Sequence, residues 1–237
     1  MVEKENDYEE IEIDLDAVIQ AHADIYAVLA RGFSLEPDEK YLDDLKRVMP
    51  WFQQISETFY DDLLFAGVKD IQDMLAVLDR DELIQDIQRQ FAALFLTGIR
   101  RMSVNPCESV YLSAERLVMQ EQRDESVEFY ARFGMGVTEE FKEPEDHIGA
   151  QLSFMSGLSM RALSALRGTG EDPAEHFING QVEFIRLHLI KWLPLLHQDI
   201  HRVSASEFYK KLVDITYGFI RTDLEYLEEI ERLLKAA

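Results

Sequence analysis

The sequence predicts an all-α protein, a single globular domain of about ten helices over residues 14–237. Apolar residues recur at three- and four-residue steps along most of the chain, as on the buried face of a helix. Short alternating β-branched runs between turn pairs, which indicate strands, do not occur. With 237 residues and 47% hydrophobic content, the chain can bury a sizeable core, and no Gly/Ser- or Pro-rich linker divides it.

The first half of the chain divides at its prolines and glycines. Residues 1–13 are acidic and without apolar periodicity, so we expect a disordered tail there. Pro37 is expected to open a helix that Pro50 ends, and Gly67 to break the next one. Apolar periodicity between these breakpoints predicts helices over residues 15–33, 37–50, 55–67, 71–78 and 83–98.

The second half begins with a loop over residues 100–109, where an Asn-Pro pair and little apolar pattern interrupt the chain. Pro144 is expected to open a helix, because N–H groups in the first helical turn have no partner within the helix, so the N–H that proline lacks is not needed there. Pro194 is expected to break or kink another helix. The predicted helices cover residues 111–119, 127–134, 144–168, 173–194 and 206–230.

Charge and cysteine content exclude several classes of protein. The net charge of −22 argues against nucleic-acid binding, since neutralising phosphates needs a basic face. The single cysteine, Cys107, allows no internal disulfide, which favours a reducing compartment. The N-terminus lacks the basic and apolar regions of a secretory signal, and charges interrupt every apolar stretch before it could span a membrane. We therefore expect a cytoplasmic protein with no membrane span.

Four motifs occur in a fixed order. They are Phe91-Ala-Ala-Leu94-Phe95, Pro106-Cys-Glu-Ser109-Val110-Tyr111, Glu143-Pro-Glu-Asp146-His147-Ile148, and a later F-x-x-x-H-x-x-x-W segment from Phe184 to Trp192. Together they resemble the TorD/DmsD family, and the likeness covers almost the whole chain. That family contains cytoplasmic chaperones that mature molybdopterin oxidoreductases, and some members bind the twin-arginine signal peptide of their client.

The resemblance implies a TorD-like fold and a binding site rather than a catalytic one. Its client would be a molybdopterin-dependent oxidoreductase precursor, with carboxylates meeting the arginine pair of the signal peptide and aromatic residues lining an apolar groove. The implied site residues are Phe91, Leu94, Phe95, Ser109, Tyr111, Glu143, Asp146 and His147.

Each of these residues also has a purely structural interpretation. The aromatic and leucine positions fit an ordinary core stripe, Asp146 and His147 fit a helix cap, and Ser109 and Tyr111 fit the end of a loop. The resemblance further implies either a monomer or a dimer that exchanges helices, and weak guanine-nucleotide binding as an additional property.

An enzyme is the alternative hypothesis, centred on histidines. His197 and His201 stand four apart with Asp199 between them, so both imidazoles share one helical face as metal ligands would. However, no H-E-x-x-H, phosphate-binding loop or hydrolase elbow occurs, and no histidine has a glutamate three residues before it. We therefore predict a chaperone with no enzymatic activity, no cofactor and no metal, and keep a helical metal- or nucleotide-dependent enzyme as the alternative.

Overall fold

The computed structural model describes residues 14–97, 103–170 and 172–236. The expected tail over residues 1–13 and part of the expected loop, residues 98–102, lie outside this part of the chain. The described residues form helices and no strand, which confirms the predicted all-α class. The elements are α1 Leu15–Ser34, α2 Glu39–Phe59, α3 Asp62–Val77, α4 Arg80–Phe91, η1 Ala92–Leu96, α5 Glu108–Leu112, α6 Glu121–Arg132, α7 Ile148–Leu166, α8 Ala174–Phe184, η2 Ile185–Leu189, α9 Ile190–Val203 and α10 Glu207–Ala236.

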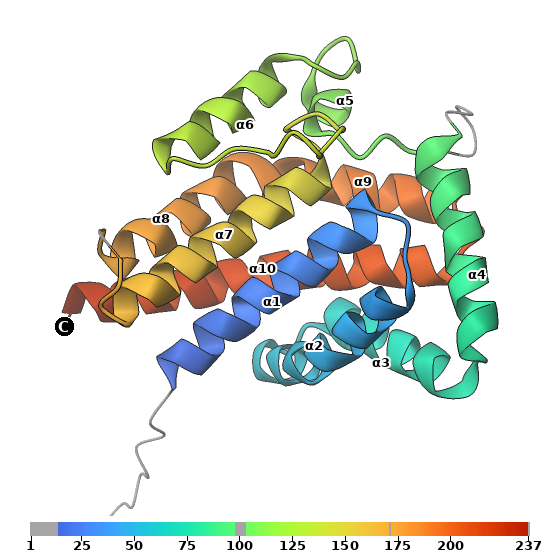
Figure 1. Ribbon diagram of the computed structural model, residues 1–237, viewed down its shortest axis with the longest axis horizontal. Helices are drawn as coiled ribbons and strands as arrows, with labels where there is room; N and C mark the ends of the chain where they lie inside the picture. Colours follow the sequence, from blue (N-terminus) through green and yellow to red (C-terminus); the bar gives the residue numbers. More distant parts are fainter. Residues whose placement is uncertain (1–13, 98–102, 171, 237) are drawn as a thin grey trace, which may run out of the picture.

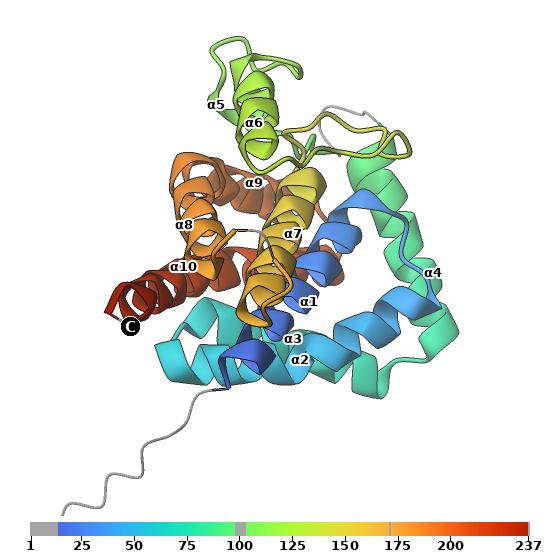
Figure 2. The same cartoon turned by 60° about the vertical axis from the view of Figure 1, so that its left-hand side comes forward.

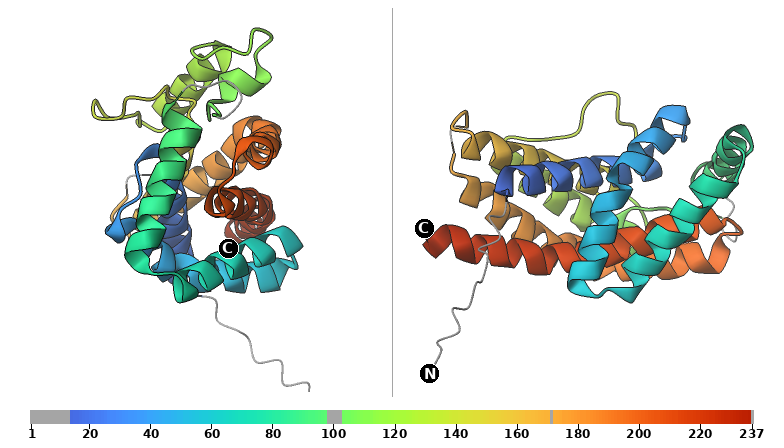
Figure 3. Two further views of the ribbon diagram at one scale, coloured as in Figure 1. Left: turned by 90° about the vertical axis from the view of Figure 1, so that its right-hand side faces the viewer. Right: turned by 90° about the horizontal axis from the view of Figure 1, so that it is seen from below.

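The core is built around the helices α1, α7 and α10. α1 packs along α7, and α10 contacts α3, α8, α9 and α2 (Figure 1). Seen from below, α10 runs most of the length of the molecule (Figure 3). Its inward face contributes a row of residues that are almost fully buried, among them Tyr209, Leu212, Ile215 and Phe219. The short helices α5 and α6 pack on each other and lie at the end of the molecule away from α2 and α3 (Figure 2).

Two helix boundaries in the first half were wrongly predicted. α2 continues through Pro50, because Phe52 beyond it is fully buried and that packing outweighs the hydrogen bond lost at the proline. α3 begins at Asp62, where Asp61 caps it by accepting from Leu64 N at 2.8 Å, and it continues through Gly67. A Cβ at Gly67 would lie 2.9 Å from Ile215 Cγ1, so this glycine permits close approach to α10 rather than ending α3.

Three boundaries in the second half also differ from the prediction. The helix expected over residues 111–119 is instead α5, five residues long and ending at Leu112. α7 begins at Ile148 rather than at Pro144, whose carbonyl accepts from His147 N at 3.0 Å in the preceding turn. α9 continues through Pro194, and Leu193 and Leu196, before and after this proline, are fully buried. None of the described helices is both long and apolar enough to span a membrane.

Candidate functional site

A cavity of about 490 Å³ lies where α1, the α4–η1 junction, α5, α9 and three loops meet, the loops of residues 103–107, 113–120 and 133–147. Its lining brings together five of the eight residues predicted from the sequence: Phe91, Phe95, Tyr111, Glu143 and His147. The other three, Leu94, Ser109 and Asp146, are buried behind this lining. Residues from α1, such as Phe33, and from α9, such as Arg202, line the same cavity although they are far apart in the sequence.

One wall of the cavity consists of two segments, residues 106–108 and 146–148, which are joined by main-chain hydrogen bonds. Ile148 N donates to Pro106 O at 2.8 Å, and Glu108 N donates to Asp146 O at 3.0 Å, on either side of an antiparallel bridge between Cys107 and His147. The second and third sequence motifs thus lie against each other. This contact holds the start of α5 beside the start of α7.

Asp146 is fully buried at this junction, where its carboxylate serves the protein itself. Its Oδ2 accepts from Ser109 N at 2.7 Å and also from the Ser109 hydroxyl. Burial and these two bonds keep the carboxylate from facing the cavity. In this conformation Asp146 and Ser109 therefore support the lining of the cavity. The sequence had suggested that Asp146 meets an arginine of the peptide, but its carboxylate is not exposed to one here.

His147 is the N-cap of α7, since its Nδ1 accepts from Gly149 N at 3.0 Å. Burial lowers the pKa of His147 to about 4, so the ring is neutral at physiological pH. Because Nδ1 is an acceptor, the proton of the neutral ring resides on Nε2. His147 also lines the cavity, so it contributes a neutral ring to the lining and not a cation.

Glu143 is the carboxylate that the cavity leaves accessible. It is exposed, lines the cavity, and makes no ion pair with any other residue that the structure describes. The neighbouring Glu145 is instead bound by Arg123, whose Nε and one terminal nitrogen both lie 2.6 Å from its carboxylate oxygens. Of the two glutamates in this motif, only Glu143 is thus available to a basic ligand.

A polar group from two helices also lines the cavity, Tyr111 on α5 with Asp199 and Arg202 on α9. Arg202 is paired with Asp199 at 2.9 Å, and Asp199 hydrogen-bonds the Tyr111 side chain. Burial, followed by the nearby Asp199 charge, raises the pKa of Tyr111, which therefore stays protonated. Asp199 and Arg202 were not predicted as residues of this site, because nothing in the sequence places α9 beside α5 and the loop before it.

A buried polar network behind Tyr111 explains the fourth motif. Glu108, 1% exposed, accepts from Gln151 Nε2 at 2.6 Å and lies 2.9 Å from His188 Nδ1. Trp192 Nε1 donates to Gln151 Oε1 at 3.0 Å, and its ring stacks on Tyr111 at 5.5 Å between centroids. The available signal was Gln151, a polar residue on the buried face of α7.

The cavity rim is apolar as well as acidic. Leu96 and Leu117 are 63% and 56% exposed and both line the cavity. Phe95 lies in the π-helical turn η1, with its ring 5.3 Å from those of Phe91 and Tyr209. Local π-turns are common at functional sites. The arrangement suits an apolar segment that carries a basic end.

Comparisons with known proteins identify a family model and relatives that match this chain. Residues 61–198 match the family model described as nitrate reductase delta subunit. The chain is 29% identical over 226 residues to the chaperone protein TorD of Shewanella pealeana, covering 91% of this chain and 94% of the relative. It is 28% identical over 220 residues to TorD of Shewanella piezotolerans, covering 89% and 94%.

A solved structure is also similar, a putative redox enzyme maturation protein from Archaeoglobus fulgidus. It is 20% identical, with 85% of this chain and 93% of that chain covered and a TM-score of 0.47. The family assignment does not depend on it. Because the family model spans more than half of the sequence, this chain belongs to the nitrate reductase delta subunit family, the TorD family that its motifs resemble.

Proposed function

We propose that this chain is a cytoplasmic chaperone that binds the precursor of a molybdopterin oxidoreductase, covers its twin-arginine signal peptide where one exists, and assists cofactor insertion. Family membership and the TorD relatives support this function. The single observation that carries the site assignment is the cavity whose wall unites three of the four sequence motifs.

The chemistry of the cavity suits a basic peptide that continues into an apolar segment. Phe95, Leu96 and Leu117 offer apolar contact, Glu143 offers an unpaired carboxylate, and His147 contributes a neutral ring and not a cation. A guanidinium binds a carboxylate through charge-assisted hydrogen bonds. The net charge of −22 adds a general attraction for a basic segment.

Binding and release are sufficient for such a function, and no bond is made or broken. The single cysteine fits this view, because burial, with the Asp146 and Glu143 carboxylates nearby, raises the pKa of the Cys107 thiol. A buried thiol held in its protonated form is a poor nucleophile. Sequestering an apolar segment would prevent its aggregation until the client has folded.

The test is calorimetry with two synthetic peptides, one carrying Arg-Arg before an apolar segment and one with Lys-Lys at the same positions. We expect the arginine peptide to bind more tightly, because the planar guanidinium matches a carboxylate in two places. Glu143→Gln should weaken its binding about two- to fivefold, as for an exposed ion pair. Glu139→Gln removes the same charge from an exposed position on the same loop outside the cavity lining, and should leave affinity unchanged.

Two results would contradict the site assignment. One is equal affinity for the arginine and lysine peptides, which would indicate a general acidic attraction. The other is an equal loss of affinity in the Glu143 and Glu139 variants.

A further inference from the structure

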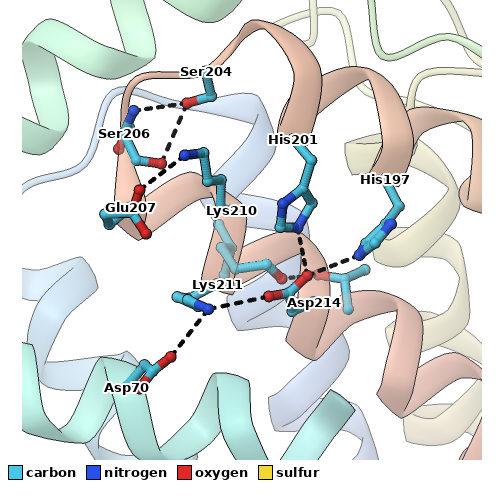
Figure 4. Close-up of polar contacts among 11 residues, drawn as sticks. Asp70, His197, His201, Ser204, Ser206, Glu207, Lys210, Lys211 and Asp214 are labelled. Atoms are coloured by element: carbon cyan, nitrogen blue, oxygen red, sulfur yellow. Dashed lines mark hydrogen bonds and ion pairs between the residues drawn. The ribbon is translucent and has the colours of Figure 1, made fainter.

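A cluster of two histidines and an aspartate lies between α9 and α10, outside the cavity lining. His197 Nε2 and His201 Nε2 lie 2.8 and 2.6 Å from the same oxygen, Asp214 Oδ1 (Figure 4). The three ligand atoms all lie within 4.8 Å of one another. The sequence shows the two histidines on one helical face, but it does not show that Asp214 approaches them from α10, and Asp199, which stands between them in the sequence, pairs with Arg202.

The geometry and chemistry of this cluster match those of a metal site. Two histidines four apart on a helix present their rings to one side, and a carboxylate from a second helix completes a set of three ligands. Such a set leaves a fourth position open, and imidazole nitrogens favour transition metals over calcium or magnesium. We propose that His197, His201 and Asp214 bind a divalent transition-metal ion, with Zn²⁺ as the ion best suited to these ligands.

Modest movement brings the three atoms to coordination distance. Ligand atoms about 2.0–2.1 Å from zinc in a tetrahedron lie about 3.3 Å apart. The His197–Asp214 and His201–Asp214 separations, 2.8 and 2.6 Å, must therefore grow by about 0.5 and about 0.7 Å, and the two Nε2 atoms, which lie within 4.8 Å of each other, must reach the same spacing. The side chains of His197 and His201 are 21% and 35% exposed, which leaves the rings free to turn and gives the ion a path from solvent. Each ring binds through Nε2 with its proton on Nδ1.

Lys211 has two opposing effects on the proposed site: it positions the Asp214 carboxylate, and its charge repels a bound cation. Its Nζ lies 3.6 Å from Asp214 Oδ2 and 3.0 Å from Asp70 Oδ2, so it holds the far oxygen of the Asp214 carboxylate while Oδ1 faces the histidines (Figure 4). Its positive charge opposes a bound cation. Removal of this charge should therefore strengthen metal binding, an effect opposite to that of removing a ligand.

The experiment is calorimetric titration of the untagged full chain with Zn²⁺ after treatment with a chelator. We expect one ion per chain, with affinity at least about tenfold weaker in His201→Gln and in Asp214→Asn. Lys211→Gln should bind more tightly than the unsubstituted protein. His176→Gln is the matched control, since His176 is an exposed histidine that packs on Phe133 away from the cluster, and it should bind as the unsubstituted protein does.

Circular dichroism of each variant verifies that the helices remain. Co²⁺ provides a second readout, because its visible absorption reports the ligands and their geometry. The proposal is overturned if the unsubstituted chain takes up no Zn²⁺ at micromolar concentration, or if His201→Gln, Asp214→Asn and His176→Gln all bind it equally well.

Discussion

The buried pair of Asp146 and Ser109 should be worth several kilocalories of folding free energy. Asp146 Oδ2 accepts two hydrogen bonds from Ser109, from its backbone N at 2.7 Å and from its hydroxyl, and both residues are 0% exposed. Hydrogen bonds to a charged group contribute about 1.5–3 kcal/mol each. Asp146→Ala should therefore cost about 3–5 kcal/mol, and Ser109→Ala, which keeps the backbone bond, about 1.5–3 kcal/mol.

Urea unfolding followed by circular dichroism at pH 7 measures both costs. The double variant should be less destabilised than the sum of the single variants, because both remove the same hydroxyl bond. A loss below about 0.5 kcal/mol for Asp146→Ala, the range of ordinary surface changes, would refute the reasoning. The same burial means that lost peptide binding in an Asp146 variant would reflect a weakened wall, whereas Glu143→Gln tests the ligand contact itself.

Three further predictions concern other buried positions. The pKa of His147 is lowered from 6.5 to about 4, so the unfolded chain binds the proton more readily and stability should fall by about 3 kcal/mol between pH 6.5 and pH 4; urea unfolding should show a flatter pH profile for His147→Gln. Gly218→Ala should cost about 1–3 kcal/mol by thermal unfolding, because its Cβ would lie 2.8 Å from Leu64 Cβ on α3. Trp192→Phe leaves the Gln151 amide oxygen without its 3.0 Å donor and should cost about 1–3 kcal/mol in urea.

Helical periodicity was sufficient to predict the class of fold but not every boundary. The apolar stripes lie on helices as expected, because burial of one face depends on spacing that the sequence displays. Pro50 and Gly67 were interpreted as breaks and Pro194 as a break or a kink, yet helices continue through all three. At each position, packing against a distant helix decides the outcome, and local propensity carries no information about that partner.

For the site, the sequence indicated which residues to consider, and their part in client binding stays a prediction. Motifs supplied Phe91, Phe95, Tyr111, Glu143 and His147, which do line one cavity. Side-chain direction could not be predicted, since the acidic turn before α7 offers one carboxylate outward and turns another inward. Only the three-dimensional arrangement shows which carboxylate is buried. For the same reason, the sequence did not predict that α9 lines the cavity with Asp199 and Arg202, or that Asp214 of α10 lies beside the histidines of α9.

The bridge between Cys107 and His147 has a consequence for how this wall can change over evolution. The bonds from Ile148 N to Pro106 O and from Glu108 N to Asp146 O are made by the main chain. Such bonds are indifferent to the side chains of the residues that form them. The wall therefore acts as a fixed frame whose outward residues can be exchanged one at a time. Recognition can therefore change through the outward side chains while the main-chain pairing at Cys107 and His147 is kept.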